Sequence, residues 1–106
     1  MPPWALLTIA ITSEVIATSA LRASDGFRRP LAVLIMLVGY GLAFYLLSLV
    51  VRDLPIGLAY AIWAGAGTAL IALVSVVAFD ERLGPIAVLG IGLVIVGIAL
   101  IHVSSL

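Results

Sequence analysis

The sequence WALLTIAITSEVIATSAL, residues 4–21, is an apolar stretch that carries a single carboxylic acid, Glu14, near its middle. The stretch is long enough to cross a bilayer as a helix, which takes about 20 residues. A charged side chain at bilayer depth costs about 3 kcal/mol on insertion scales, so such residues usually face a cavity or a partner and act there. We therefore take Glu14 as the principal candidate functional residue.

The helix face around Glu14 has room beside the carboxyl group. Residues three, four and seven positions apart share a helix face, and on this face they are Leu7, Ala10, Ile11, Ala17, Thr18 and Leu21. Several of these side chains are small, so a ligand or another helix can approach Glu14. One alternative remains open, in which Glu14 only hydrogen-bonds a neighbouring helix.

A signal peptide is a second interpretation of this stretch, because residues 17–20 imitate a cleavage site. Two features of the sequence argue against it. No Lys or Arg precedes the apolar run, and an acid interrupts it where the core of a signal peptide is purely apolar.

The composition is that of a membrane protein. Of its 106 residues 65% are hydrophobic and 9% are charged, against about 25% charged in an ordinary soluble domain. We expect a single all-α membrane domain over residues 1–106, with four transmembrane helices at about 4–21, 30–51, 56–79 and 85–103. The absence of cysteine excludes disulfides and Cys-ligated metals, and the net charge of zero argues against nucleic-acid binding.

The charged residues other than Glu14 lie in three short connections. The first contains Ser24-Asp25-Gly26, which is typical of a turn that includes a residue with positive φ. Connections one and three together hold four arginines, whereas the second holds only Arg52. On the positive-inside rule, connections one and three are predicted to be cytoplasmic, with both termini outside.

Aromatic residues line one face of each middle span. Tyr40 and Phe44 share a face of the second span, and Tyr60 and Trp63 share a face of the third. Gly39 and Gly41 flank Tyr40, which allows another backbone to approach closely there.

Glycines mark two further features. Gly65 and Gly67 predict a hinge, because residues without side chains let a helix bend. Gly90 and Gly97 lie seven apart on a stripe of the last span, where they permit close packing either within one chain or between two chains of a dimer. His102 near the end of that span is interpreted as an interfacial residue, with a proton-handling role as the alternative.

These residues indicate the binding of a cation rather than catalysis. Glu14 has no second carboxylate at membrane depth with which to hold a metal, and the sequence shows no nucleophile–base pair or phosphate loop. Aromatic faces attract organic cations, and a carboxylate supplies the counter-charge. Apolar surroundings disfavour the ionised carboxyl, so Glu14 can hold a proton or pair with a cation but poorly do both, which is the physical basis of antiport. Because transporters usually place such a site between two repeats, we expect two chains to be needed.

The chain resembles the small multidrug resistance family over essentially its whole length, and four motifs carry the resemblance: EVIAT at 14–18, SDGF at 24–27, PIG at 55–57 and AYAIWAG at 59–65. The resemblance implies a proton-coupled exporter of toxic organic cations with no cofactor. It also implies an antiparallel dimer in the bacterial inner membrane, in which both copies of Glu14 share one site. Family pocket positions match Trp4, Leu7, Ala10, Ile11, Thr18, Tyr40, Phe44, Tyr60 and Trp63, and the family's dimer stripe matches Gly90 and Gly97.

The family has a quaternary-ammonium multidrug branch and a guanidinium branch. The guanidinium branch typically has a Trp three residues after the glutamate, where this chain has Ala17, so the multidrug branch is favoured. Two positions depart from the multidrug pattern: Ala43 where a Ser is frequent, and Trp4 where a Tyr is common. A guanidinium or polyamine exporter of the same family, or one half of a heterodimer with a paralogue, remains an alternative.

Two interpretations from other protein classes compete with a transporter: a rotor subunit, which also holds a mid-membrane acid, and a structural or assembly subunit. A proton-carrying rotor subunit of an ATP synthase is a two-helix hairpin with dense Gly repeats, which four spans with an aromatic face do not match. A structural or assembly subunit would tolerate replacement of Glu14, whereas an antiporter would not.

Overall fold

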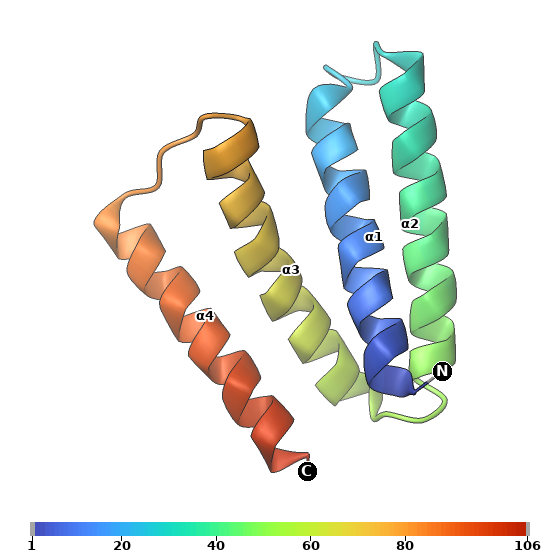
Figure 1. Cartoon of the computed structure of the whole chain (residues 1–106), viewed down its shortest axis with the longest axis vertical. Helices are drawn as coiled ribbons and strands as arrows, with labels where there is room; N and C mark the ends of the chain where they lie inside the picture. The colour runs from blue at the N-terminus through green and yellow to red at the C-terminus, as the bar shows by residue number, and fades with distance from the viewer. Residues whose placement is uncertain (1, 106) are drawn as a thin grey trace.

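The described part of the chain forms four antiparallel helices (Figure 1): α1 (Pro3–Ala23), α2 (Pro30–Val50), α3 (Ile56–Ala78) and α4 (Pro85–Ser104). The structure is a computed structural model, and it describes residues 2–105. Each helix is long and apolar enough to cross a membrane. The prediction of an all-α, four-span membrane protein is confirmed, and the helix ends differ from the predicted ones by no more than two residues.

Prolines fix where the helices begin. Pro3, Pro30 and Pro85 lie in the first turns of α1, α2 and α4, and Pro55 immediately precedes α3. The first N–H groups of a helix have no intrahelical partner, so a residue without an N–H loses nothing there. No helix start has a side-chain cap, and proline provides the local start signal in its place.

The four helices form a slab rather than a round bundle. The slab measures 43 × 35 × 17 Å, whereas one helix with its side chains is about 10–12 Å across. α1 packs along α2 and, on another face, against α3, while α4 packs against α3 at the edge of the slab (Figure 1). Within the part that the structure describes, α4 has no buried residue, so one chain leaves this helix largely uncovered.

The core lies among α1, α2 and α3. Its buried residues come from these three helices and are Leu7, Ala10, Ile11, Val15, Ala43, Leu46, Val50, Ala59, Ile62 and Trp63. Gly39 marks the close approach of α2 to α1, because a Cβ added at Gly39 would lie 2.8 Å from the Ala17 Cβ. The Ser13 hydroxyl donates a 2.8 Å hydrogen bond to the Gly39 carbonyl. The expected close approach therefore occurs at Gly39, whereas a Cβ at Gly41 would meet nothing within 4 Å.

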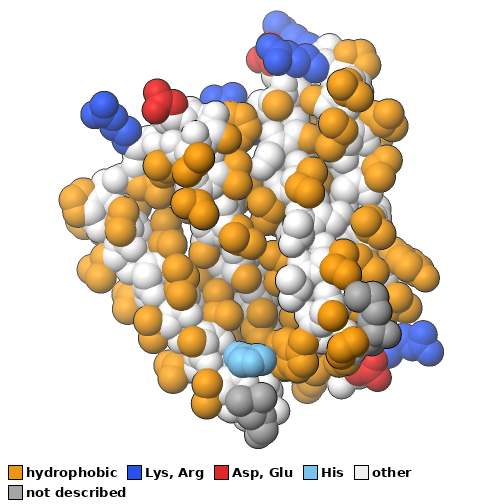
Figure 2. Space-filling model, in the orientation of Figure 1, with side chains coloured by type: hydrophobic (Ala, Val, Ile, Leu, Met, Phe, Trp, Pro, Cys, Tyr) orange, Lys and Arg blue, Asp and Glu red, His pale blue; other side chains and the backbone are white. Residues whose placement is uncertain are grey.

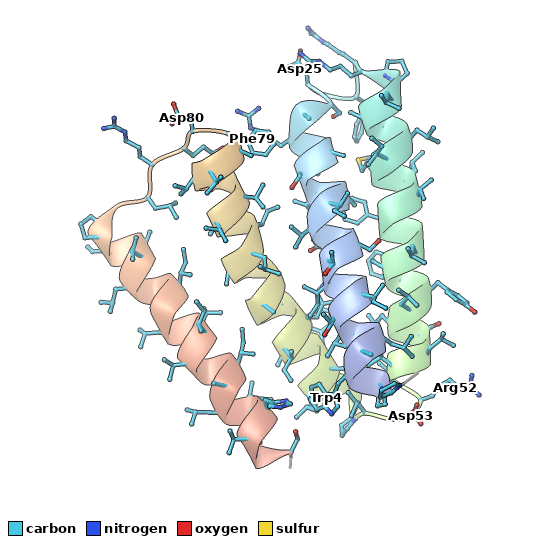
Figure 3. The ribbon with its side chains drawn as sticks, viewed as in Figure 1. Trp4, Asp25, Arg52, Asp53, Phe79 and Asp80 are labelled. Carbon is cyan, nitrogen blue, oxygen red and sulfur yellow. The ribbon has the colours of Figure 1, made fainter. Side chains whose placement is uncertain are left out.

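The connections hold the charged residues at the two ends of the slab. Figure 2 shows a face covered by hydrophobic side chains, with the charged side chains gathered at the ends. Asp25 and Asp80 lie at one end, and Arg52 and Asp53 lie at the other (Figure 3). Connections one and three therefore share an end, as four antiparallel spans require. The arginine-rich end is the one predicted to be cytoplasmic.

The first connection is a tight turn built around Ser24. The buried Ser24 hydroxyl donates to the Leu21 carbonyl at 2.8 Å and accepts the Phe27 N–H at 3.1 Å. Asp25, Gly26 and Phe27 have φ values of 53°, 71° and 66°. The prediction of a turn with positive φ is confirmed, and it extends to the residues on both sides of the glycine.

Gly39→Ala is expected to destabilise the fold more than Gly41→Ala. Both changes bring the same gain in helix propensity, but only the first places a Cβ against α1. Overpacking of this kind costs about 1–3 kcal/mol. Thermal unfolding of the two variants in detergent measures the difference, and equal melting temperatures would show that α1 and α2 do not approach as closely as described.

Candidate functional site

Glu14 lies at one pocket with the predicted aromatic residues. The pocket has a volume of about 330 Å³ and is lined by residues of α1, α2 and α3: Glu14, Tyr40, Phe44, Leu47, Tyr60, Trp63, Ala64, Gly67, Thr68 and Ile71. Helical periodicity explains this set, because residues three or four positions apart fall on one face. α2 contributes positions 40, 44 and 47, and α3 contributes positions 60, 64, 67 and 71.

The two oxygens of Glu14 have different surroundings. Oε1 accepts a 2.8 Å hydrogen bond from the Thr18 hydroxyl, one helical turn away. Oε2 lies beside α3 at Gly67, where an added Cβ would be 3.3 Å from it. Because Gly67 lacks a side chain, α3 can lie against the carboxylate without covering it. One oxygen is thus held by the protein, while the other borders α3.

The hydrogen bond to Glu14 continues to α2. Thr18 Oγ1 lies 2.7 Å from the Tyr40 hydroxyl. A threonine hydroxyl has one proton, and here Thr18 gives it to Glu14, so Tyr40 must donate to Thr18. The chain therefore runs from Tyr40 through Thr18 to the carboxylate. Each donor points toward Glu14.

The aromatic wall of the pocket is incomplete within one chain. The Phe44 and Trp63 rings lie 5.8 Å apart at an interplanar angle of 32°. Trp63 is only 9% exposed, but Phe44 is 61% and Tyr60 is 63% exposed. Large aromatic faces are therefore open on the side of the pocket that α1, α2 and α3 do not close.

The predicted pocket residues lie in different parts of the structure. Glu14, Tyr40, Phe44, Tyr60 and Trp63 line the pocket together, and Thr18 adjoins it through its hydrogen bonds. Three others do not line the pocket but are buried in the core of the single chain, and they are Leu7, Ala10 and Ile11.

Trp4 lies away from this pocket, at the end of the slab that holds Arg52 (Figure 3), where its ring packs edge-on against His102 at 4.7 Å. His102 thus packs against an aromatic ring near the end of its span. Substrate contact by Trp4 and by the three core residues stays a prediction. Ala43, which replaces the frequent Ser, is fully buried in the core.

Five lining residues were not predicted as pocket residues from the sequence, Gly67 among them having been predicted only as a hinge: Leu47, Ala64, Gly67, Thr68 and Ile71. Leu47 lies three residues after Phe44, and the others follow Tyr60 at helical spacing. Extending the two aromatic faces by one or two turns would have found them. They were missed because aliphatic and small residues are common on every face of a membrane helix.

The glycines of α3 and α4 have different surroundings. A Cβ at Gly65 would lie 2.8 Å from side-chain carbons of Ile98 in α4. Together with Gly67 beside Glu14, Gly65 allows α3 to approach its neighbours closely. α3 is continuous through both positions, so a hinge there stays a prediction. At Gly90 and Gly97 an added Cβ would meet nothing within 4 Å, so these two residues do not serve packing within the chain, and their role in a dimer stays a prediction.

Known proteins match the chain over nearly its whole length. Residues 2–94 match the model of the family described as Small Multidrug Resistance protein. A multidrug transporter of Pseudomonas aeruginosa is 48% identical over 99% of this chain and 96% of its own length. The quaternary ammonium compound-resistance proteins QacF of Klebsiella aerogenes and QacE of Escherichia coli are 43% and 40% identical, each with the same coverage. A four-span membrane fold, a family match over most of the sequence and these identities agree: the chain belongs to the small multidrug resistance family.

Proposed function

We propose that the protein exports lipophilic organic cations, including quaternary ammonium compounds, in exchange for protons, and that Glu14 binds the proton and the cation in turn. One observation carries this proposal: the only ionisable carboxyl within the four described helices borders a pocket with four aromatic side chains. The relatives named as a multidrug transporter and as quaternary ammonium resistance proteins support the class of substrate. The protein acts as a transporter and not as an enzyme, and it needs no cofactor besides the proton.

The pocket suits a bulky, weakly hydrated cation. The aromatic rings offer π faces, which attract a cation within about 6 Å of a ring centroid. Glu14 supplies the counter-charge, and Leu47, Ile71 and Ala64 supply apolar contacts. A cation with several apolar groups gains from all three, whereas a small hydrated cation loses its water without filling the space. This favours lipophilic substrates.

A single chain does not complete the site. The open aromatic faces and the uncovered α4 leave room for a second copy, and secondary transporters place their sites between two repeats. We propose that two chains pack antiparallel in the bacterial inner membrane and bring both copies of Glu14 into one cavity. The excess of arginine at one end favours one orientation. The partner is therefore either a second copy of this chain or a paralogue, and in both cases it inserts with the opposite orientation.

The environment of position 17 favours multidrug export over guanidinium export. Ala17 is fully buried, and its Cβ lies where α1 meets Gly39 of α2. The Trp that the guanidinium branch typically has at this position would not fit without separating the two helices. The close packing of α1 against α2 in this chain therefore requires a small residue at position 17.

Glu14→Gln is expected to abolish both proton-driven export and cation binding. Glutamine keeps the size of the side chain and can still accept the Thr18 hydrogen bond, but it has neither the charge nor the titratable proton. Uptake of a quaternary ammonium dye into liposomes with an imposed pH gradient measures export, and gel filtration checks that the variant still assembles. A folded variant that still drives uphill transport would contradict the role of Glu14.

Competition at one carboxylate predicts a pH-dependent affinity. Where Glu14 is protonated, the affinity for tetraphenylphosphonium should fall about tenfold per pH unit for each proton displaced, which is roughly 1.4 kcal/mol. Trp63→Ala should weaken binding at every pH by about 1–2 kcal/mol if the cation–π contact is desolvated, with the slope unchanged. Calorimetry across pH separates the two effects. An affinity that does not vary from about pH 5 to 9 would exclude a shared site.

Gly97→Leu is expected to weaken association of the two chains, because bulk on the glycine stripe separates backbones that would otherwise approach closely. Ala99→Leu adds similar bulk on another face of α4 and serves as the control. Cross-linking in detergent measures association, and circular dichroism checks helix content. If both variants cross-link and transport as the unmodified protein does, the stripe is not part of the interface.

A further inference from the structure

A second cavity lies between α1 and α3, beyond the Glu14 pocket. Its volume is about 290 Å³, and it is lined by Thr18, Ser19, Arg22, Ile71, Ala72, Ser75, Phe79 and Glu81. Five of these eight residues are polar or charged, in a part of the protein where most side chains are apolar. A cavity of this size has room for several water molecules, and the hydroxyl and charged groups among its lining residues can hydrogen-bond them.

The cavity continues from the Glu14 pocket toward the end that holds connections one and three. On α1 the residues in line are Glu14, Thr18 and Arg22, each one helical turn from the next. Ile71 of α3 lines both cavities. Thr18 lines the second cavity and hydrogen-bonds the carboxylate that lines the first. The Thr18 hydroxyl is therefore the polar group that connects the two.

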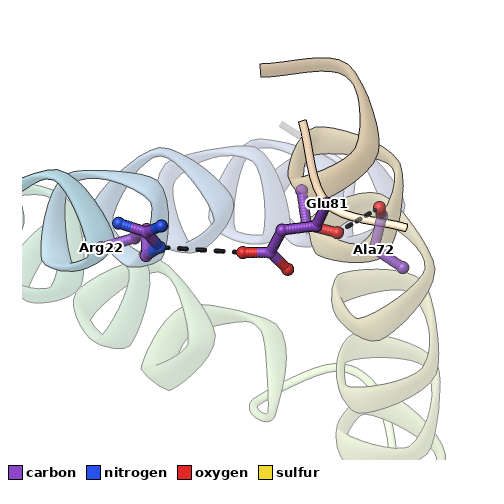
Figure 4. Close-up of polar contacts among 4 residues, drawn as sticks. Arg22, Ala72 and Glu81 are labelled. Carbon is purple, nitrogen blue, oxygen red and sulfur yellow. Dashed lines mark hydrogen bonds and ion pairs between the residues drawn. The ribbon is translucent and has the colours of Figure 1, made fainter. Parts of the chain in front are cut away.

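An ion pair crosses the outer end of the second cavity. Arg22 Nε lies 3.7 Å from Glu81 Oε2 (Figure 4), and the Arg22 guanidinium lies 5.1 Å from the centroid of the Phe79 ring. The Glu81 N–H also donates to the Ser75 carbonyl at 2.9 Å, which ties connection three to α3. Both charged side chains are about half exposed. A long, solvent-exposed pair contributes little stability, so it can open and close readily.

We propose that the second cavity is the route by which protons pass between Glu14 and water, with Thr18 as the relay and the Arg22–Glu81 pair as its outer closure. This inference rests on the proposed proton exchange and gives it a path. The ionisable groups that border the path are Arg22 and Glu81 at its outer end and Tyr40 beside Thr18.

The hydroxyl of Thr18 can relay a proton without changing its own charge. To protonate Glu14, a hydronium ion in the cavity gives a proton to Thr18 Oγ1 while Thr18 passes its own proton to Glu14 Oε1. One proton leaves the water, one reaches the carboxylate, and Thr18 stays neutral. Release reverses these steps. The Tyr40 hydroxyl remains a hydrogen-bond donor that orients Thr18 toward Glu14.

In an antiparallel pair, the second cavities of the two copies would open at opposite faces of the membrane. Breaking one Arg22–Glu81 pair at a time would admit water from one face only. The same local device, present once in each copy, would then provide alternating access for protons.

Ser75→Leu tests the route because it fills the second cavity without touching the Glu14 pocket. Stopped-flow measurement of proton release on adding tetraphenylphosphonium gives a rate and an amplitude, with the full chain in lipid nanodiscs. We expect a rate at least tenfold slower, with the amplitude and the equilibrium affinity unchanged. Ala78→Leu adds similar bulk on an exposed part of α3 that lines neither cavity, and it should release protons at the unmodified rate. A normal rate in Ser75→Leu would overturn the route.

Thr18→Val and Thr18→Ser test the relay independently. Valine removes the hydroxyl and should slow proton release, whereas serine keeps it and should restore the rate. Thr12→Val removes an α1 hydroxyl that bonds only a backbone carbonyl, and it serves as the control. Equal rates in the Val and Ser variants would overturn the relay. If the unmodified protein releases no protons, the proposed exchange itself fails, whereas release that depends on Glu14 but not on Ser75 or Thr18 removes this inference alone.

Discussion

The cost of placing a carboxylate inside a bilayer is the constraint on which the rest of the structure depends. Glu14 can stay at mid-membrane depth only where its oxygens have partners or where a cavity replaces lipid. Thr18 is the partner of one oxygen and is itself held by Tyr40, and Gly67 keeps α3 from covering the second oxygen. The neighbours of Glu14 are thus arranged to tolerate the charge, and the pocket beside it is where that charge can act.

The thinness of the slab links the fold to assembly. With α4 unburied and the rings of Phe44 and Tyr60 exposed, one chain leaves the Glu14 pocket open on one side. Lipid covers apolar surface without penalty, so exposure alone does not demand a partner. A cation site is different, because a cation bound on an open face would still border lipid tails. Folding alone therefore does not require a second chain, whereas the proposed transport does, because the bound cation must be enclosed.

Two cavities lie where α1 meets α3, and in the proposed exchange one would bind the cation and the other would carry the proton. The pocket with Phe44 and Trp63 has the space and the π faces that an organic cation needs. Five of the eight residues that line the cavity with Ser75 and Arg22 are polar or charged, and its one aromatic ring, Phe79, already lies against the Arg22 guanidinium. Glu14 borders one and reaches the other through Thr18. In the proposed exchange, the cation would therefore approach Glu14 from one cavity and the proton from the other.

The sequence by itself determined the four spans, the place of Glu14 and the aromatic faces, because chain-local periodicity and the cost of charge in lipid act on each helix separately. It also placed the turn at Gly26. Only the tertiary structure decided that Gly39 meets Ala17, that Gly67 borders Glu14 and that Tyr40 reaches Thr18. It also buried Leu7 in the core of the single chain and brought Arg22 beside Glu81. These contacts depend on which helix faces are opposed and at what height, and the spacing of residues within one helix carries no information about either.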